Sequence, residues 1–174
     1  MNPEKYITNN FFGKSFKFEE KSRRIKDIEN KVKETNNVEK IFVVWLQGES
    51  DALNFTGTDK YLEMLIKFKN DIKNEIDFDK FTIIRQGYFA EYADWVDKPK
   101  FLKKKSDKEI MRALDLAPNL DGDFYMLTRV CARLSKNKKY LNDKEYGPHY
   151  NNAGMEIIGK KAGLSLAKYR IKNG

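Results

Sequence analysis

Cysteine, histidine, tryptophan and proline are all scarce in this chain of 174 residues, which has one, one, two and four of them. The single cysteine, Cys131, excludes an intramolecular disulfide, and its neighbours TRVCARL predict a buried, unreactive thiol at the end of a packed strand. No segment approaches about 18 uncharged apolar residues, and the N-terminus lacks an apolar core of signal-peptide length. We therefore expect a cytoplasmic protein with no membrane partner.

Lysine supplies most of the formal net charge of +8, and it is interleaved with 26 acidic residues. This pattern is typical of a solvated surface, and binding to nucleic acid or an anionic sugar is the weaker interpretation. The densest run, KPKFLKKKSDK over 98–108, predicts an exposed loop and a helix start, because neither an aromatic stacking motif nor a recognition-helix pattern accompanies it. We predict no nucleic-acid partner.

Apolar residues make up 40% of the chain, enough to fill the core of one domain over 1–174. Three runs of apolar residues predict strands, at 41–46, 80–89 and 123–130. Helix-period patterns alternate with them, at 16–34, 58–76 (with Thr58 as N-cap), 106–118 (opened by Ser106 and stopped by Pro118) and 151–172 (capped by Asn151 or Asn152). This alternation predicts an α/β fold in three layers: a mostly parallel, flavodoxin-like sheet with helices on both faces.

The first predicted strand runs directly into polar residues. In the stretch IFVVWLQGESDA, the apolar run gives way at once to Gln47, Gly48, Glu49, Ser50 and Asp51. Ligands bind beyond the carboxyl ends of the strands in open α/β sheets, where a glycine lets a substrate approach the backbone and an amide side chain can donate to an oxyanion. The alternative is an ordinary polar turn, since Gly, Glu, Ser and Asp are common turn residues.

The only histidine, His149, lies between a Gly147-Pro148 turn and the start of the last predicted helix. A lone histidine is more often structural than catalytic. Here the Gly-Pro turn fixes its approach, and a parallel sheet would bring this loop to the same edge as the polar block at 47–51. A general base must be held in a fixed position near the substrate, so we predict that His149 belongs to the site.

Two blocks, WLQGESDA and HYNNAGMEIIGKKAG about a hundred residues later, together resemble the sialate O-acetylesterase-like branch of the SGNH (GDSL-type) hydrolases. Members carry a Trp-x-Gln-Gly-Glu-x-Asp block and a His block of the form Asp-x-x-His. The resemblance runs from about Val38 to the C-terminus, and residues 1–37 match the family poorly. It implies an SGNH hydrolase fold and a serine esterase that removes acetyl groups from carbohydrates or a small ester, with neither a metal nor another cofactor.

The resemblance also implies roles for individual residues. A serine just after the first strand of the family attacks the ester carbonyl, and His149 is its base. Gln47 and Gly48 would line the oxyanion site, Glu49 and Asp51 would shape the pocket, and Ser50 could donate a further hydrogen bond.

Two departures from the family concern the catalytic triad. The family's nucleophile lies well upstream of the first block, and the only Gly-x-Ser there is FFGKSF, which contains Ser15. Either Ser15 is a degenerate nucleophile, or the first strand and its serine are absent and the chain is a truncated relative; the short spacing favours absence. Tyr146 stands where the family has the aspartate that orients the histidine, and Asp143 and Glu145 lie off that spacing. A backbone carbonyl could orient His149 instead, or it could act in a dyad.

Two other interpretations remain open. In the first, QGESDA is a nucleophile elbow with Ser50 attacking, but Ala52 stands where that motif has glycine, and the charge of Asp51 would oppose an oxyanion. In the second, the chain keeps the esterase scaffold without its serine and binds a glycan or another partner. Aromatic residues that could stack on a sugar are Tyr88, Tyr92, Trp95 and Trp45, the last of which we expect in the core.

Overall fold

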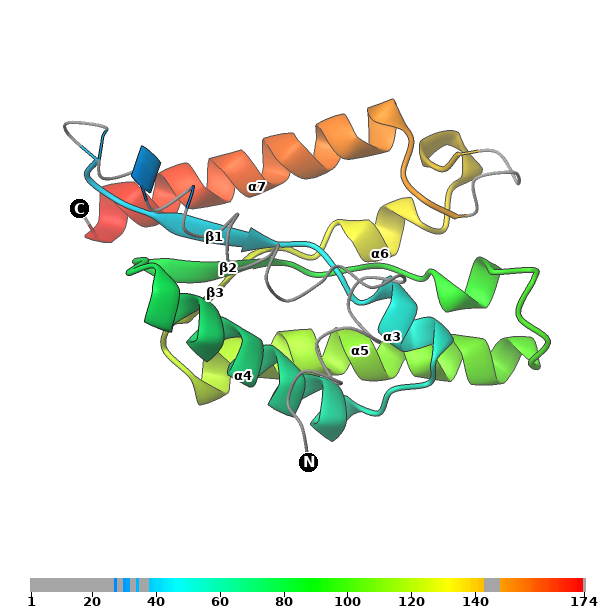
Figure 1. The fold of residues 1–174 in the computed structure, drawn as a ribbon. Coiled ribbons are helices and arrows are strands. Elements are labelled where there is room, and N and C mark those ends of the chain that lie inside the picture. The colour runs from blue at the N-terminus through cyan, green and yellow to red at the C-terminus, as the bar shows by residue number, and fades with distance from the viewer. Residues whose placement is uncertain (1–26, 28–29, 32–33, 35–37, 143–147, 174) are drawn as a thin grey trace.

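Three short parallel strands form the sheet in the computed structural model, which describes residues 27, 30–31, 34, 38–142 and 148–173 (Figure 1). The strands are β1 (Phe42–Trp45), β2 (Lys80–Ile84) and β3 (Phe124–Thr128), in the order β1-β2-β3. Phe81 of β2 lies between Val43 of β1 and Phe124 of β3 in the register. The predicted α/β class and parallel pairing are confirmed.

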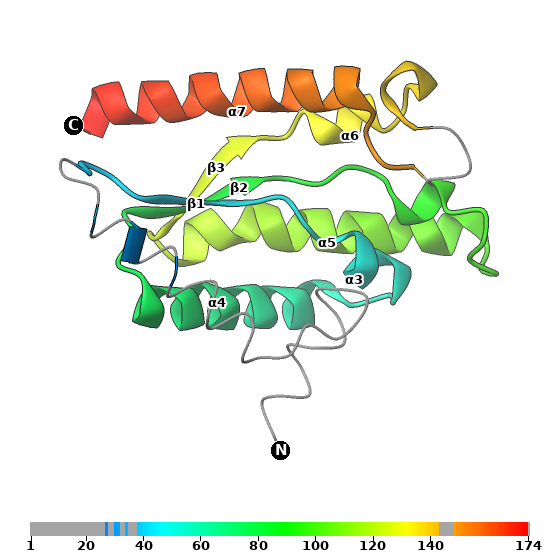
Figure 2. The same ribbon diagram turned by 45° about the horizontal axis from the view of Figure 1, so that its top comes forward.

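Helices lie on either side of this sheet. The α-helices between residues 38 and 173 are α3 (Glu49–Leu53), α4 (Thr58–Glu75), α5 (Lys100–Leu120), α6 (Cys131–Leu134) and α7 (Asn152–Asn173), with short 3₁₀ turns η1 (Ala90–Tyr92) and η2 (Lys138–Tyr140). Figure 2 shows α4 and α5 on one face and α7 on the other, with α3, α6 and the start of α7 beyond the carboxyl ends of the strands. Within the described residues, no helix is long and apolar enough to cross a membrane.

The main core lies between the sheet and the α4–α5 face. Phe81 is fully buried at its centre, and its ring lies 5.3 Å from the ring of Phe124 and 5.9 Å from that of Trp45. Leu65 of α4 and Leu114 of α5 complete this cluster. Burying each such side chain contributes about 1.5–3 kcal/mol. Trp45 is therefore in the core, as predicted.

Helix α5 differs most from its predicted bounds. It begins at Lys100, after Pro99, and continues through Pro118 to Leu120, so the predicted start at Ser106 and stop at Pro118 are wrong. Ser106 is buried in mid-helix, where its hydroxyl donates to the carbonyl of Ala52. Pro118 lies in the last turn, where its missing N–H removes a single hydrogen bond that the burial on this face outweighs.

The Lys-rich run at 98–108 contains a helix start, as predicted, but the start is at Lys100, so most of the predicted loop is helical. The expectation of full exposure is wrong at Lys103, which is 6% exposed. Its ammonium group donates to the carbonyl of Ala93 at 2.8 Å, and this hydrogen bond makes the buried position tolerable.

Other predicted boundaries are also corrected. Thr58 is the first residue of α4 rather than its N-cap, and its hydroxyl donates to the carbonyl of Glu109 on α5. Asn151 caps α7, because its side-chain oxygen accepts from the N–H of Gly154. Cys131 is buried as predicted, and burial raises the pKa of its thiol to about 12, but it begins α6 instead of ending a strand.

The predicted strands are longer than the observed ones, and β2 ends at Ile84 although the prediction extended to Phe89. The next five residues leave the sheet to form the loop at its carboxyl edge. The predicted helix at 16–34 lies almost entirely outside the described residues. Within that range the structure describes only residues 27, 30, 31 and 34.

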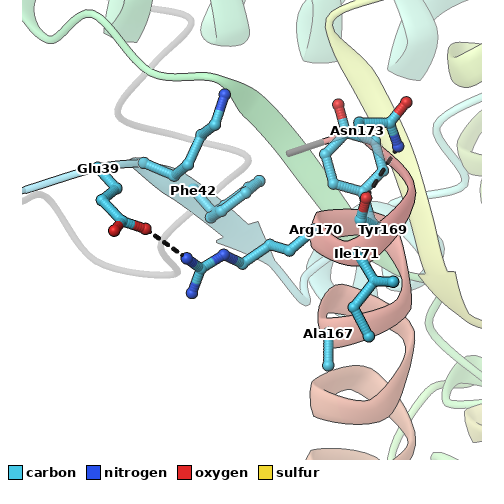
Figure 3. Close-up of a pocket in the computed structure, with 8 residues that line it drawn as sticks. Glu39, Phe42, Ala167, Tyr169, Arg170, Ile171 and Asn173 are labelled. Carbon is cyan, nitrogen blue, oxygen red and sulfur yellow. Dashed lines mark hydrogen bonds and ion pairs between the residues drawn. The ribbon is translucent and has the colours of Figure 1, made fainter.

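The last turns of α7 lie beside the amino end of β1, around a cavity of about 470 Å³ (Figure 3). A guanidinium nitrogen of Arg170 donates to the carboxylate of Glu39 at 2.7 Å across this cavity. The ring of Tyr169 meets that of Phe42 edge-on, with 6.0 Å between centroids. These contacts join α7 to the sheet at the end opposite to the polar block at 47–51.

Candidate functional site

The block at 47–51 lies at the carboxyl end of β1, where the chain turns into α3. Gly48 has a φ of 134°, which favours glycine, and a Cβ there would lie 2.7 Å from the Cγ2 of Ile110 and 2.9 Å from the Oε1 of Gln86. From beneath, the hydroxyl of Tyr61 donates to the carbonyl of Gln47 at 3.1 Å. The backbone of this turn is thus fixed, and no side chain fits at 48.

Gln86 is the functional candidate that sequence reasoning missed. Its side chain is only 1% exposed, it lies against Gly48, and neither its nitrogen nor its oxygen has a hydrogen-bond partner among the described residues. Buried amides are nearly always paired, so this one is a donor and acceptor available to a ligand or water. The sequence did hold a signal, because Gln-Gly follows β2 at 86–87 as it follows β1 at 47–48.

Burial raises the pKa of the carboxyl groups around this turn. Burial raises the pKa of Glu49, although backbone hydrogen bonds act in the opposite direction. Asp51 is 1% exposed, and burial raises its pKa to about 7. The Oδ1 atom of Asp51 has no hydrogen-bond partner in the part of the chain that the structure describes. Asp51 therefore adds less negative charge to the site near neutral pH than its formal charge indicates.

Asp107 of α5 shapes the loop after β2. Its buried carboxylate accepts hydrogen bonds from three successive N–H groups, those of Phe89, Ala90 and Glu91, at 3.1, 2.9 and 2.8 Å. Burial raises its pKa, although these three N–H groups lower it. The carboxylate holds η1 in place, and with it the ring of Phe89.

Gly87 joins the loop after β2 to the His149 segment. A Cβ at this position would lie 2.5 Å from the carbonyl oxygen of Cys131 and 2.6 Å from the hydroxyls of both Ser135 and Tyr150. The hydroxyl of Tyr150 donates to that same carbonyl at 3.0 Å, and the Ser135 hydroxyl accepts from the N–H of Tyr88. The residue next to His149 is thereby fixed against the ends of β2 and β3.

His149 lies on this edge as an exposed residue. Its ring packs 4.8 Å from the ring of Phe89, which lies 6.3 Å from that of Trp95. Trp95 is 59% exposed, whereas Phe89, which contacts both other rings, is only 7% exposed, so the aromatic surface of these three residues is formed by Trp95 and His149. The imidazole makes no hydrogen bond to any residue whose position the structure describes.

The remaining predicted site residues either lie outside the described residues or are not joined to His149. Ser15 and the triad candidates Asp143, Glu145 and Tyr146 lie outside the described residues. Ser50 is in the first turn of α3, and its hydroxyl is not hydrogen-bonded to His149 or to any other described group. Among the described residues, no group of three His, Cys, Asp or Glu side chains is placed to hold a metal ion.

Comparisons of this chain with protein-family models, curated proteins and solved structures found no match.

Proposed function

We propose that this chain has the scaffold of an SGNH-type serine esterase, resembling the sialate O-acetylesterase branch, and acts on O-acetyl groups of carbohydrates. The observation that carries the proposal is the contact between Gly48 and the unpartnered amide of Gln86, at the sheet edge that also holds His149. A fixed turn beside an unsatisfied donor is what an oxyanion site requires, because a preorganised donor stabilises charge that develops in the transition state.

In this proposal a serine oxygen attacks the acetyl carbonyl carbon while His149 takes the serine proton and then passes it to the departing sugar oxygen. Water repeats the sequence and releases acetate. Gln47, Gly48 and Gln86 supply donors to the oxyanion, each worth roughly 10²–10³ in rate. The raised pKa of Asp51 supports this arrangement, because a protonated carboxyl group does not repel the oxyanion.

The aromatic surface supports a carbohydrate as the substrate. Trp95 is 59% exposed and packs against Phe89, whose ring also contacts that of His149. Sugar rings present apolar C–H faces that pack on such an indole, while their hydroxyls stay hydrated. A sugar stacked on Trp95 would place its acetyl group on the same edge as Gly48.

A second candidate function is glycan binding without hydrolysis. Two serine hydroxyls near the site already hydrogen-bond to the backbone: that of Ser106 donates to the carbonyl of Ala52, and that of Ser135 accepts from the N–H of Tyr88. No serine among the described residues is hydrogen-bonded to His149. This observation favours a scaffold that binds sugar but lacks an activated nucleophile.

A fluorophosphonate probe distinguishes the two functions, because it reacts only with an activated serine. For an esterase we expect one labelled serine, mapped to Ser15, with labelling abolished in His149→Ala and kept in the control Ser165→Ala on α7. Labelling of Ser50 would instead support the elbow interpretation. Labelling that His149→Ala leaves unchanged would contradict the proposal.

The second function has its own readout. Without labelling, retention of the chain on an acetylated glycan column, lost in Trp95→Ala, would identify a binding protein. A chain that neither reacts with the probe nor binds the column would exclude both functions.

A further inference from the structure

A second cavity, of about 480 Å³, lies between α5 and the residues that follow β2 and β3. Four of its lining residues are basic, namely Arg85, Lys108, Arg112 and Arg129. Among the residues with described positions, Asp115 is the only acidic one that lines it. The lining thus carries a net charge of about +3, and such a concentration of one sign attracts an anion.

Asp115 holds two of the four cations in fixed positions. Its Oδ1 accepts from the Nε of Arg129 at 2.6 Å, and its Oδ2 accepts from a terminal nitrogen of Arg85. The Arg85 side chain is only 17% exposed, so its guanidinium is held rigidly against the wall of the cavity. Orienting the two guanidinium groups in advance lowers the entropy that a ligand would lose on binding them.

Lys108 and Arg112 have no ion-pair partner among the residues with described positions. They are four residues apart on α5 and both are exposed, so two like charges lie one above the other on the helix. Such a pair destabilises an isolated helix slightly. An anion bound between them would remove this repulsion.

Tyr88 also lines this cavity. The ammonium groups of Lys136 and Lys104 lie 4.8 and 5.8 Å from the centre of its ring. Lys104 pairs with the carboxylate of Glu91 at 3.4 Å, so it is Lys136 that extends the positive charge around the cavity. Arg85 and Tyr88 line the cavity, whereas Gln86 and Gly87 between them face the turn at Gly48 and the hydroxyl of Tyr150. The loop at 85–88 thus contributes residues both to this cavity and to the candidate site.

We propose that this cavity binds a phosphate group, either as the free ion or esterified to a molecule of sugar size. Guanidinium groups match the oxygens of phosphate in charge and geometry, and a dianion suits a lining with a net charge of about +3. The volume of the cavity is within the usual range of small-ligand sites. The inference is independent of the proposed esterase function.

The test uses the full chain and two probes, inorganic phosphate and glucose 6-phosphate, titrated at constant ionic strength by calorimetry and amide NMR. The test variant is Lys108→Gln with Arg112→Gln. The control is Lys161→Gln with Lys168→Gln, two exposed positions on α7 that carry the same change of charge. Thermal melts check that both double variants fold.

We expect the shifted amides to surround the cavity and the test variant to weaken binding about tenfold or more, while the control changes it less than about twofold. Tighter binding of glucose 6-phosphate than of phosphate would show that the cavity accepts the sugar, and equal binding would show a site for the phosphate group alone. Equal effects of the two double variants, or no saturable binding of either probe, would overturn the proposal.

Discussion

At the amino ends of the three strands the buried and half-buried charges are paired, whereas at the carboxyl ends several buried polar atoms have no described partner. Lys69, whose side chain is 5% exposed, lies 2.8 Å from a carboxylate oxygen of Asp121 and 3.2 Å from one of Asp123. Asp79 accepts from the N–H of Ile41 and pairs with Lys40. At the other end, Asp51 and Gln86 keep unpaired atoms at 1% exposure.

Carboxyl pKa values follow the same division. At the amino ends, burial is the largest single influence and raises the pKa of Asp79 and Asp121, but the hydrogen bonds and nearby lysines together outweigh it and lower both values. The Ile41 N–H and Lys40 act on Asp79, and Lys69 is the main lowering group at Asp121. At the carboxyl ends, burial dominates and raises the pKa of Glu49 and Asp51. One end of the sheet is arranged for stability. The other retains unsatisfied groups that cost about 1–3 kcal/mol each, as ligand sites do.

The largest effect is expected at the carboxyl end, for Gly48→Val. A β-branched side chain there meets Ile110 and Gln86 within 3 Å and requires a φ of 134°, so we expect a loss of about 3 kcal/mol or more in the free energy of unfolding. Urea unfolding measures it. Glu63→Val, at a side chain 70% exposed on α4, is the control and should change stability by less than about 0.5 kcal/mol. Equal effects would show that Gly48 is only a turn residue.

At the amino end, Lys69→Met should cost about 2 kcal/mol, because it removes the buried ammonium group that pairs with both Asp121 and Asp123. Lys73 stays within 3.5 Å of Asp123 and compensates only that carboxylate. The matched change Lys67→Met removes an exposed pair with Asp71 on the same helix and should cost less than about 0.5 kcal/mol. The lowered pKa of Asp121 adds a pH signature: this stabilisation is present above its unfolded pKa and is lost as the pH falls below about 4. Similar losses for both variants would contradict the contrast between the two ends.

The smallest effect is a pH trend at Asp51. Its folded pKa of about 7 exceeds its unfolded value, so the folded state holds a proton that the unfolded chain has released, and stability falls as the pH rises between the two values. Relative to the natural chain, Asp51→Asn should gain about 1–2 kcal/mol between about pH 5 and pH 7. Urea unfolding at several pH values measures this. A difference that stays constant over the range would contradict a neutral Asp51.

Those parts of the fold that follow from local pattern could be predicted. The apolar runs gave the three strands and the parallel α/β class, and the asparagine before α7 gave its start. The first two turns of α5 were not predicted as helix, because their lysines and the serine are residue types typical of an exposed loop. Lys103 and Ser106 are buried only because carbonyls from distant segments accept their protons, and no local pattern records those partners.

The candidate site, like the fold, was predicted only in part. The block at 47–51 was found because polar residues follow an apolar strand without a break. Gln86 was missed because the pattern at 80–89 predicted one long strand, so Gln86 and Gly87 were placed inside the strand instead of after its end. Pairs such as Lys69 and Asp123, 54 residues apart in sequence, arise only when the strands are set side by side.

The two tryptophans give the molecule a pair of built-in optical probes. Trp45 is 6% exposed beneath the turn at Gly48, and Trp95 is 59% exposed on the surface beside His149. A neutral quencher such as acrylamide should therefore extinguish the red-shifted emission of Trp95 while leaving the blue-shifted emission of Trp45 nearly intact. A sugar seated on the aromatic surface would shield only the first signal, whereas loss of the core would expose the second, so that ligand occupancy and unfolding can be followed separately in one cuvette.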